Sequence, residues 1–536
     1  MYSVGIGTPI VVAVACILYI MINIDTVANP MANYGLLVVS NAAKVQSMFL
    51  KAFKLVNKVL YINIIGNFEG ALPVVSKQIT NIYEEATNHS SSLDVRLMLK
   101  TGDAVHKIKT YYTIDLMMYD SVLSRETDKI KESVVNLKSG CKLKSIESKD
   151  TIATDSDNLE AVKTYEYVAL GGTFDRLHNG HKILLSHAVL RATKHLTVGV
   201  TDVNMIQSKK LWELIEPVEQ RIKAVQNFLK DINPDLQYNV VPIQDMYGPT
   251  KDDPKFQLLV VSEETARATV KINEKRKENG LKALDSYVIG LARDSHPKRS
   301  HEEEEKLSSS NQRMRLLGTL LRPPVPNPNI PDWPYVIGLA GGIASGKSSI
   351  MDKLKKKGAA VVNCDLIAHE LYRPGLPLNT TIAESFGRQV ITEDGEVDRK
   401  KLGQIVFSDH EQLEKLNQLV WPAVVEEANR RIRVLGEQGY RVVVMEAAVM
   451  VRAKWYIHCH QLWSVIIPPE EAIKRLQDRN GLSEEEARQR IAAQPSNAEQ
   501  VAPANVVFSP FWSYEYTQGQ VDRAWEQLQR YLETRQ

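Results

Sequence analysis

The sequence predicts an α/β protein in which two domains built on parallel sheets follow an amino-terminal α/β region. Three observations predict this class. From residue 164 onward, short apolar runs of strand length alternate with longer segments of helical pattern. Two of these runs, Tyr167–Leu170 and Tyr335–Ala340, lead directly into glycine-rich loops. Between them, six prolines fall within residues 323–334, where no helix or central strand can continue.

The composition is that of a multidomain globular protein. At about 100–200 residues per domain, 536 residues indicate three or four domains. An apolar fraction of 44% and a charged fraction of 24% exclude a disordered, collagen-like or polytopic membrane protein. The net charge of only +2 argues against nucleic-acid binding through a broad basic surface. Four scattered cysteines without a CxxC pair favour a reducing compartment over disulfides or a zinc cluster.

The amino-terminal segment has the character of a membrane anchor. Residues 1–24 carry no charged side chain, and the run Ile10–Met21 is almost wholly apolar. Because about 20 apolar residues cross a bilayer as a helix, we expect an anchor here, with the rest of the chain in the cytosol. A buried helix or a poorly defined start of the reading frame would also explain the pattern. The apolar, lysine-edged residues 35–60 fit either a helix on a membrane surface or an amphipathic helix packed on the protein.

Composition also suggests where the domains begin and end. Residues 25–137 mix helix and strand patterns without a chemical motif, so their role is unknown, and the polar residues 138–163 are expected to be a linker. A strand at Thr164–Ala169 opens a domain expected over residues 164–322. After the proline-rich linker at 323–334, a final domain covers 335–536.

The loop at residues 341–348 matches the phosphate-loop pattern GxxxxGK[ST] and follows an apolar strand, the context that this motif requires. Its glycines let backbone N–H groups point at phosphates, and the following helix adds its positive end. We expect Lys347 to reach the β- and γ-phosphates of ATP and Ser348 to ligate Mg²⁺. The expected ATP-binding residues are Gly341, Gly342, Ile343, Ala344, Ser345, Gly346, Lys347, Ser348 and Ser349.

Two strands of the final domain lead into carboxylates. Asp365 is expected to accept the proton of an attacking hydroxyl, although it could instead cap the following helix. Glu446 would hold metal-bound water, or serve the structure alone. Four arginines, Arg475, Arg479, Arg488 and Arg490, flank a short polar excursion, which suits a lid that closes over phosphates; a solvated helix face with ion pairs is the alternative.

Residues 335–530 resemble the dephospho-CoA kinase family. The resemblance rests on the stretches 336–348, 363–369, 398–403 and 479–488. It implies that Asp365 receives the proton of the 3′-hydroxyl of dephospho-CoA, and that Arg479 and Arg488 lie in or beside a lid.

The final domain departs from that family at three places. Glu446 stands where an aspartate is usual, and Trp421-Pro422 replaces the His-Pro common in bacterial members. An asparagine expected late in the chain is missing around Phe508-Ser509, which affects the contact on the adenine side.

The other glycine-rich loop, residues 171–181, contains the HxGH motif His178-Asn-Gly-His181 directly after an apolar strand. Two histidines three residues apart at a helix start share one face, where they can donate hydrogen bonds to the α-phosphate of ATP as it is attacked. Two ordinary helix-capping histidines are the alternative. The ATP-binding residues expected here are Gly171, Gly172, Thr173, Phe174 and His181.

A serine run far downstream complements this loop. Ser308, Ser309 and Ser310, with Arg313 one turn into a helix, are expected to hold the β- and γ-phosphates; a flexible surface loop is the alternative. Basic residues after the second strand are expected to grip the phosphate of the acceptor, or to form a solvated face. These are Lys209, Lys210 and Arg221.

Residues 165–322 resemble the eukaryotic phosphopantetheine adenylyltransferases of the HxGH nucleotidyltransferase superfamily. The resemblance rests on the stretches 171–181, 247–254, 260–265 and 308–313, and departs from the family at Asn311-Gln312. It implies a Rossmann-like sheet that transfers AMP from ATP to 4′-phosphopantetheine.

The order of the two modules is similar to that of the bifunctional coenzyme A synthases of animals. This implies that the final domain, a P-loop kinase, phosphorylates the dephospho-CoA that the central domain makes, both steps using ATP and Mg²⁺. It also implies a cytosol-facing position on the mitochondrial outer membrane. A nucleotidyltransferase fused to a small-molecule kinase with other substrates is the alternative.

Overall fold

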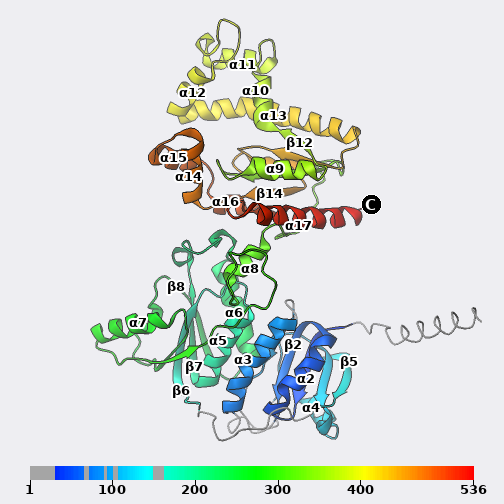
Figure 1. Cartoon of the computed structure of the whole chain (residues 1–536), viewed down its shortest axis with the longest axis vertical. Helices are drawn as coiled ribbons and strands as arrows, with labels where there is room; N and C mark the ends of the chain where they lie inside the picture. Colours follow the sequence, from blue (N-terminus) through cyan, green and yellow to red (C-terminus); the bar gives the residue numbers. More distant parts are fainter. Residues whose placement is uncertain (1–30, 66–71, 90–92, 100–106, 149–161, 536) are drawn as a thin grey trace, which may run out of the picture. The chain divides into compact units, whose positions relative to one another are not determined.

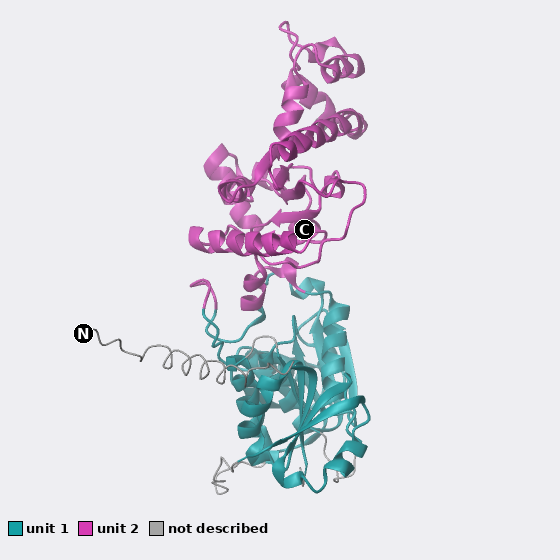
Figure 2. Ribbon diagram, turned by 90° about the vertical axis from the view of Figure 1, so that its right-hand side faces the viewer, with its two compact units in different colours: residues 1–209, 216–297, 304–309 teal, residues 210–215, 298–303, 310–536 magenta. Residues whose placement is uncertain are grey.

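The structure, a computed structural model, describes residues 31–65, 72–89, 93–99, 107–148 and 162–535 (Figure 1). It forms two compact units, one comprising residues 1–209, 216–297 and 304–309, the other 210–215, 298–303 and 310–536 (Figure 2). The first unit contains two five-stranded parallel sheets and the second contains one. The described residues therefore form three parallel sheets, where the sequence predicted two behind an α/β region of unknown form.

The amino-terminal sheet has the strand order β3-β2-β1-β4-β5. Its strands are β1 (Ala32–Val39), β2 (Val56–Ile64), β3 (Asp94–Leu97), β4 (Ile114–Asp120) and β5 (Leu137–Ile146), with helices α2 (Val45–Ala52), α3 (Leu72–His89) and α4 (Thr127–Ser133). Strand β1 is central and pairs with β2 and β4, so Leu36–Val39 are buried on both sides. That position explains the continuous apolar run.

Two expectations for this region were wrong. Residues 35–60 do not form one long helix on a membrane or on the protein, because their first part is the buried strand β1 and only Val45–Ala52 is an α-helix. The segment 138–163 is not wholly a linker, because strand β5 (Leu137–Ile146) lies at the sheet edge and includes the first residues of that segment. Its side chains are largely exposed, which is why the strand reads as polar.

The central sheet has the order β10-β9-β6-β7-β8. Its strands are β6 (Tyr165–Gly172), β7 (Ala192–Thr201), β8 (Gln237–Ile243), β9 (Leu258–Ser262) and β10 (Asp285–Ile289), with helices α5 (Asn179–Arg191), α6 (Val218–Ile232) and α7 (Ala266–Glu278). When the strands of each sheet are numbered along the chain, the central and the amino-terminal sheets both have the order 3-2-1-4-5. One hydrophobic core runs through both sheets, and helices α3 and α5 contribute to it from either side.

The longest segment of the second unit, residues 310–536, begins with most of helix α8 (Ser309–Leu316). Residues 323–334 contain neither helix nor strand, as predicted. The carboxyl-terminal sheet of this unit has the order β12-β13-β11-β14-β15. The strands are β11 (Tyr335–Gly341), β12 (Ala360–Asn363), β13 (Val442–Glu446), β14 (Gln461–Val465) and β15 (Val506–Phe508).

Helices cover both faces of the carboxyl-terminal sheet. They are α9 (Lys347–Lys356), α10 (Cys364–Leu371), α11 (Pro377–Phe386), α12 (Arg399–Ser408), α13 (His410–Glu437), α14 (Pro469–Asn480), α15 (Glu484–Ala492), α16 (Asn497–Val501) and α17 (Tyr514–Glu533). Alternate residues of β11 point to opposite faces: Ile337 and Leu339 pack with α9 and α17, whereas Val336 and Ala340 pack in the core of helices α10–α13.

Both glycine-rich loops leave the carboxyl end of a central strand, β6 or β11, beside the point where the strand order reverses. This is where open parallel sheets bind ligands. The anchor predicted at residues 1–24 lies outside the described residues. Among those that are described, none of the helices combines the length and apolar character that crossing a bilayer requires.

Candidate active sites

The strand, loop and helix predicted around the carboxyl-terminal motif are confirmed: buried β11 leads through the loop into α9. The loop bends where only glycine fits. Gly346 has φ +93, and a Cβ there would meet Cγ of Pro510 at 2.7 Å. A Cβ at Gly341, with φ +153, would meet the carbonyl oxygen of Val465 at 2.7 Å. The two glycines therefore give the loop its shape.

Lys347 is the first residue of α9, and its ammonium bends back over the loop. Nζ donates hydrogen bonds to the carbonyl oxygens of Gly341 at 2.7 Å and Gly342 at 3.5 Å. Burial lowers the pKa of Lys347, while Glu446 and Asp365 act in the opposite direction. A partly desolvated cation held at the mouth of a loop interacts strongly with an arriving phosphate.

Asn363 connects the two candidate carboxylates. Its Oδ1 accepts the backbone N–H of Leu366 and so caps α10, while its Nδ2 donates to Oε2 of Glu446 at 2.6 Å. The cap predicted as the structural role of Asp365 thus belongs to Asn363. Asp365 lies in the first turn of α10, where its carboxylate accepts the backbone N–H of Ala448 at 3.3 Å.

Glu446 ends strand β13 and is only 7% exposed. Burial raises its pKa, although the nearby Lys347 opposes that shift. Within the described residues, no group of three or more His, Cys, Asp or Glu side chains could hold a metal. The hydroxyl of Ser348 and the carboxylate of Glu446 do line one cavity, and such oxygen donors suit Mg²⁺ when phosphate oxygens complete the shell.

A cavity of about 690 Å³ opens over the loop. It is lined by Gly342, Ile343, Ala344, Ser345, Gly346, Lys347, Ser348, Glu446, Ala448, Arg475, Asp478, Arg479 and Gln494. Of the predicted lid arginines, Arg475 and Arg479 line it, whereas Arg488 lies on the exposed surface of α15 and pairs with Glu484 at 2.7 Å.

Gln494 was not predicted for this site, whereas Arg475 was expected in the lid together with Arg479. Arg475 donates to the carbonyl oxygens of Pro510 at 2.8 Å and Ala344 at 3.4 Å, and Gln494 accepts the N–H of Ile343 at 2.7 Å. Both contacts join segments far apart in the chain. The spacing of Arg475 and Arg479, which places them on one face of a helix, was the signal for the arginines, and the sequence held no such signal for Gln494.

In the central sheet, the loop from β6 to α5 holds an unusual backbone. Phe174 and Arg176 have φ +53 and +47, a region that side chains other than glycine seldom adopt and that is concentrated at functional sites. Buried Asp175 stabilises the turn, since its Oδ1 accepts from the backbone N–H of Glu216 and from the Arg176 guanidinium, both at 3.0 Å.

The two histidines of the motif lie together at the start of α5. Their ring centroids are 3.8 Å apart with planes 21° from parallel, and His181 also contacts Phe174. His178 Nε2 lies 3.3 Å from Oγ of Ser309, which in turn donates to the carbonyl oxygen of Asp175. A Cβ at Gly180 would lie 3.2 Å from the His178 ring.

Burial, with a smaller contribution from His181, holds the pKa of His178 well below its usual value. A neutral imidazole can donate one hydrogen bond and accept another. Within the part of the chain that the structure describes, Nδ1 of His178 is buried without a hydrogen-bond partner. Because Ser309 gives its O–H to Asp175, neutral His178 donates its single N–H from Nε2 to Ser309, and it can donate to a phosphate oxygen over the loop only by exchanging Ser309 for that oxygen.

Arg221 does not do what the sequence suggested. It is 1% exposed, and its guanidinium donates to the carbonyl oxygens of Thr173 at 2.7 Å, Thr201 at 2.9 Å and Glu216 at 2.7 Å. The Arg221 side chain is therefore buried and stabilises the loop between β6 and α5, instead of facing solvent. Thr173 also accepts a 3.1 Å hydrogen bond from the hydroxyl of Thr201.

The other predicted residues fall in both units. Lys209, Ser308 and Ser309 belong to the first unit, together with the histidines, whereas Lys210, Ser310 and Arg313 belong to the second. There, the Arg313 guanidinium donates to the carbonyl oxygen of Lys210 at 2.9 Å and contacts the Ser310 hydroxyl at 3.4 Å. Their roles toward phosphate stay predictions.

Comparison with known proteins assigns both regions. Residues 335–510 match the family model described as dephospho-CoA kinase, and residues 169–315 match the one described as cytidylyltransferase-like. The dephospho-CoA kinase of Carboxydothermus hydrogenoformans is 40% identical over 186 residues, which are 35% of this chain and 90% of that protein. That of Shouchella clausii is 37% identical over 34% of this chain and 94% of that protein.

A solved structure, the dephospho-CoA kinase from Campylobacter jejuni, is 23% identical, with a TM-score of 0.30 over 36% of this chain and 96% of that one. The curated kinases are covered almost completely by the second unit, with the loop, the lysine and the cavity described above. Through this region the chain belongs to the dephospho-CoA kinase family, and ahead of it the same chain carries a cytidylyltransferase-like domain.

Proposed function

We propose that this chain carries out two consecutive reactions of coenzyme A synthesis. The central domain transfers AMP from ATP to 4′-phosphopantetheine and releases pyrophosphate; the carboxyl-terminal domain then transfers the γ-phosphoryl group of a second ATP to the 3′-hydroxyl of dephospho-CoA. The observation that carries the proposal is that two separate loops, each at the carboxyl end of a central strand, present phosphate-binding groups in one chain that includes a dephospho-CoA kinase domain.

In the kinase step, Lys347 exchanges its hydrogen bonds to loop carbonyls for bonds to the β- and γ-phosphates. Asp365, beside the loop, accepts the proton of the 3′-hydroxyl as it attacks. Arg475 and Arg479 face the same cavity and add positive charge opposite the transferred group. Mg²⁺, held by Ser348 and the phosphates with Glu446 nearby, would neutralise the charge that develops on the phosphate oxygens.

In the adenylyl step, the phosphate of phosphopantetheine attacks the α-phosphorus of ATP, so the protein needs no nucleophile of its own. His178 and His181 donate hydrogen bonds to the oxygens of the five-coordinate α-phosphate, and Gly180 allows the nucleotide to approach. Because the pKa of His178 is low, this residue is neutral at physiological pH, and its single N–H passes from Ser309 to the α-phosphate oxygen when ATP is bound.

Two substitutions in the full-length chain test the pair of assignments. His181→Ala is expected to reduce adenylyl transfer by about 10²–10³, the usual cost of losing one transition-state donor, while phosphorylation of added dephospho-CoA is nearly unchanged. Lys347→Ala should have the reverse effect. If either substitution reduced both reactions equally in folded protein, the two-site assignment would be wrong.

A second candidate changes the substrates of the central domain. Its match to a model described only as cytidylyltransferase-like leaves both the nucleotide and the acceptor open. The distinguishing assay offers ATP or CTP with phosphopantetheine or choline phosphate and identifies the product by mass. The proposal also includes a location at a membrane, through residues 1–24. Cell fractionation of a tagged chain that still has these residues tests it, and recovery of that chain in the soluble fraction would contradict the location.

A further inference from the structure

The HxGH helix is in contact with the amino-terminal domain from its first residue. Asn179 stands between His178 and Gly180, and its Nδ2 donates to Oγ1 of Thr87 at 3.0 Å and to the carbonyl oxygen of Tyr83 at 3.2 Å. Both acceptors lie on α3. The Thr87 side chain is only 4% exposed and is itself held by a 2.8 Å hydrogen bond to the same carbonyl of Tyr83.

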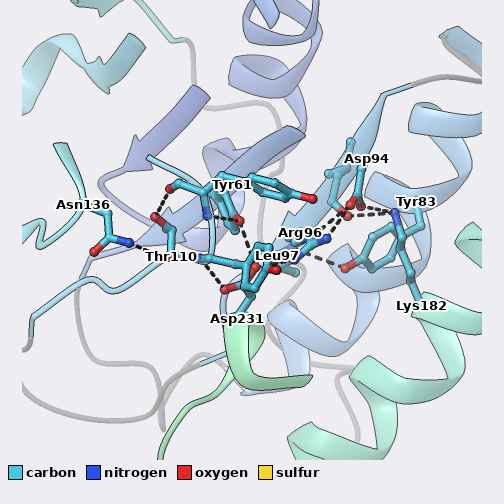
Figure 3. A network of polar contacts seen from close by, with 12 residues as sticks. Tyr61, Tyr83, Asp94, Arg96, Leu97, Thr110, Asn136, Lys182 and Asp231 are labelled. Atoms are coloured by element: carbon cyan, nitrogen blue, oxygen red, sulfur yellow. Dashed lines mark hydrogen bonds and ion pairs between the residues drawn. The ribbon is translucent and has the colours of Figure 1, made fainter. Parts of the chain in front are cut away.

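A second contact follows directly after the second histidine. Lys182 is 4% exposed, and its Nζ lies 2.5 Å from Oδ1 of Asp94 and 3.3 Å from the carbonyl oxygen of Val95, both on strand β3 (Figure 3). Burial alone would raise the pKa of Asp94, but Lys182 and Arg96 outweigh it and keep that pKa below its usual value. The first turn of α5 thus contacts the amino-terminal domain once within the HxGH motif, through Asn179, and once directly after it, through Lys182.

The ion pair of Lys182 and Asp94 is part of a buried network whose members come from both the amino-terminal and the central domain. Arg96 pairs with Asp94 at 2.7 Å and with Asp231 at the end of α6, while Tyr61 donates to Asp231 at 2.8 Å (Figure 3). The network contains two cations and two anions, so its charges balance. Buried pairs of this kind add little net stability, but removing one partner leaves an uncompensated buried charge.

The amino-terminal domain does not reproduce the chemistry of its neighbour, although its strand order is the same. Where β6 leads into the two histidines, β1 leads into residues 40–44, which contain no histidine. Lys44 there pairs with buried Asp120 at 3.1 Å, and Ser40 donates to the same carboxylate. This position is occupied by interactions within the domain itself.

We propose that the amino-terminal domain is a positioning element for the nucleotidyl transfer site. By holding Asn179 and Lys182, it fixes the first turn of α5 and with it the two histidines. Thr87 and Asp94 are positioning residues, since they touch neither substrate nor histidine. This inference rests on the adenylyl transfer proposed above, and it gives residues 31–148 a role that no motif within them indicates.

The experiment compares Thr87→Val with Thr87→Ser in the full-length chain. Valine has the shape of threonine but accepts no hydrogen bond from Asn179, whereas serine retains the acceptor. We expect Thr87→Val to reduce kcat of adenylyl transfer by about 10- to 100-fold with little change in the KM for ATP, as misplaced catalytic groups do. Thr87→Ser should restore kcat to within about threefold of the wild type. Asp94→Asn, which weakens the partner of Lys182, should resemble Thr87→Val.

Phosphorylation of added dephospho-CoA by the same molecules monitors the other unit and should be unchanged. Tyr61→Phe is the control for stability, because it removes a bond of the same network far from α5; it should lower the unfolding temperature without lowering kcat. Unchanged kcat in Thr87→Val, or equal losses in Thr87→Val and Tyr61→Phe, would overturn the positioning role. A wild-type chain that phosphorylates dephospho-CoA but adenylylates nothing would instead refute the proposed function itself, and this inference with it.

Discussion

The side-chain amide of Asn363 donates a 2.6 Å hydrogen bond to Oε2 of Glu446, joining the start of α10 to the end of strand β13. The same side chain caps α10, whose first turn carries Asp365. One residue therefore sets both the direction of the helix with the candidate base and the orientation of the carboxylate beside Lys347. This dual role can be separated by substitution.

Asn363→Asp retains the oxygen that caps α10 but places a carboxylate against Glu446 where a donor stood. We expect the kcat for dephospho-CoA phosphorylation to fall by about 10- to 100-fold, the usual effect of losing the partner of a site carboxylate. Adenylyl transfer by the same chain is the internal control. If Asn363→Asp were fully active and only Asn363→Ala impaired, the cap alone would matter.

Gly346 and Gly358 form a matched pair for testing the loop. Both have strongly positive φ, +93 and +100, but a Cβ at Gly346 meets Pro510 at 2.7 Å, whereas nothing lies within 4 Å at Gly358. Gly358→Ala should cost about 1–2 kcal/mol of unfolding free energy from backbone strain, with normal kinase turnover. Gly346→Ala should in addition lower kcat/KM for ATP by about 100-fold. Equal activity of the two variants would show that the contact with Pro510 does not shape the loop.

The phosphate loop could be predicted because its determinants are local. Strand, glycines, lysine and helix start follow one another within residues 335–356, and each has its own sequence signal. The contacts of Arg475 and Gln494 with this loop bridge more than 130 residues, and no periodicity encodes them. Asn363 was missed for a different reason: Asn and Asp cap helices equally well, so the sequence alone could not choose between Asn363 and Asp365.

The amino-terminal sheet was harder to predict because its strands β1 and β5 do not show the alternation of apolar and polar residues that indicates a half-buried strand. Strand β1 is buried on both faces and reads as a continuous apolar run, which also suits a helix near a membrane. Strand β5, at the sheet edge, exposes most of its side chains and reads as a linker. The core shared with the central sheet appears only in three dimensions, and so does the partnership of Lys182 with Asp94.

The half-buried imidazole of His460 predicts an acid sensitivity of the kinase unit. Its Nδ1 accepts the N–H of Val336 at 2.9 Å, and burial lowers its pKa to about 4 from 6.5. As the pH falls below 6.5, His460 becomes protonated in the unfolded chain, whereas in the folded chain it stays neutral until about pH 4. The free energy of unfolding that is present above pH 6.5 therefore decreases between pH 6.5 and 4. The rate of heat inactivation of the kinase should therefore increase as the pH is lowered from 6.5 to 4, and it should increase less in His460→Asn. Identical pH profiles for the two proteins would exclude His460 as the cause.

Arg479 and Arg488 were predicted together as lid residues, yet only Arg479 lines the cavity, and its Nε donates to Oδ1 of Asn480. Arg488 forms an exposed pair with Glu484 four residues earlier, an interaction worth about 0.3–0.5 kcal/mol. We expect Arg479→Gln to lower kinase kcat by about 10- to 100-fold, because a cation facing the transferred phosphoryl group is lost. Arg488→Gln should change kcat less than about threefold if the helix pair α14–α15 works in the arrangement seen here. The measurement is the steady-state rate of dephospho-CoA phosphorylation over a range of ATP concentrations. If kcat fell as much in Arg488→Gln as in Arg479→Gln, α15 would have to move onto the nucleotide during turnover.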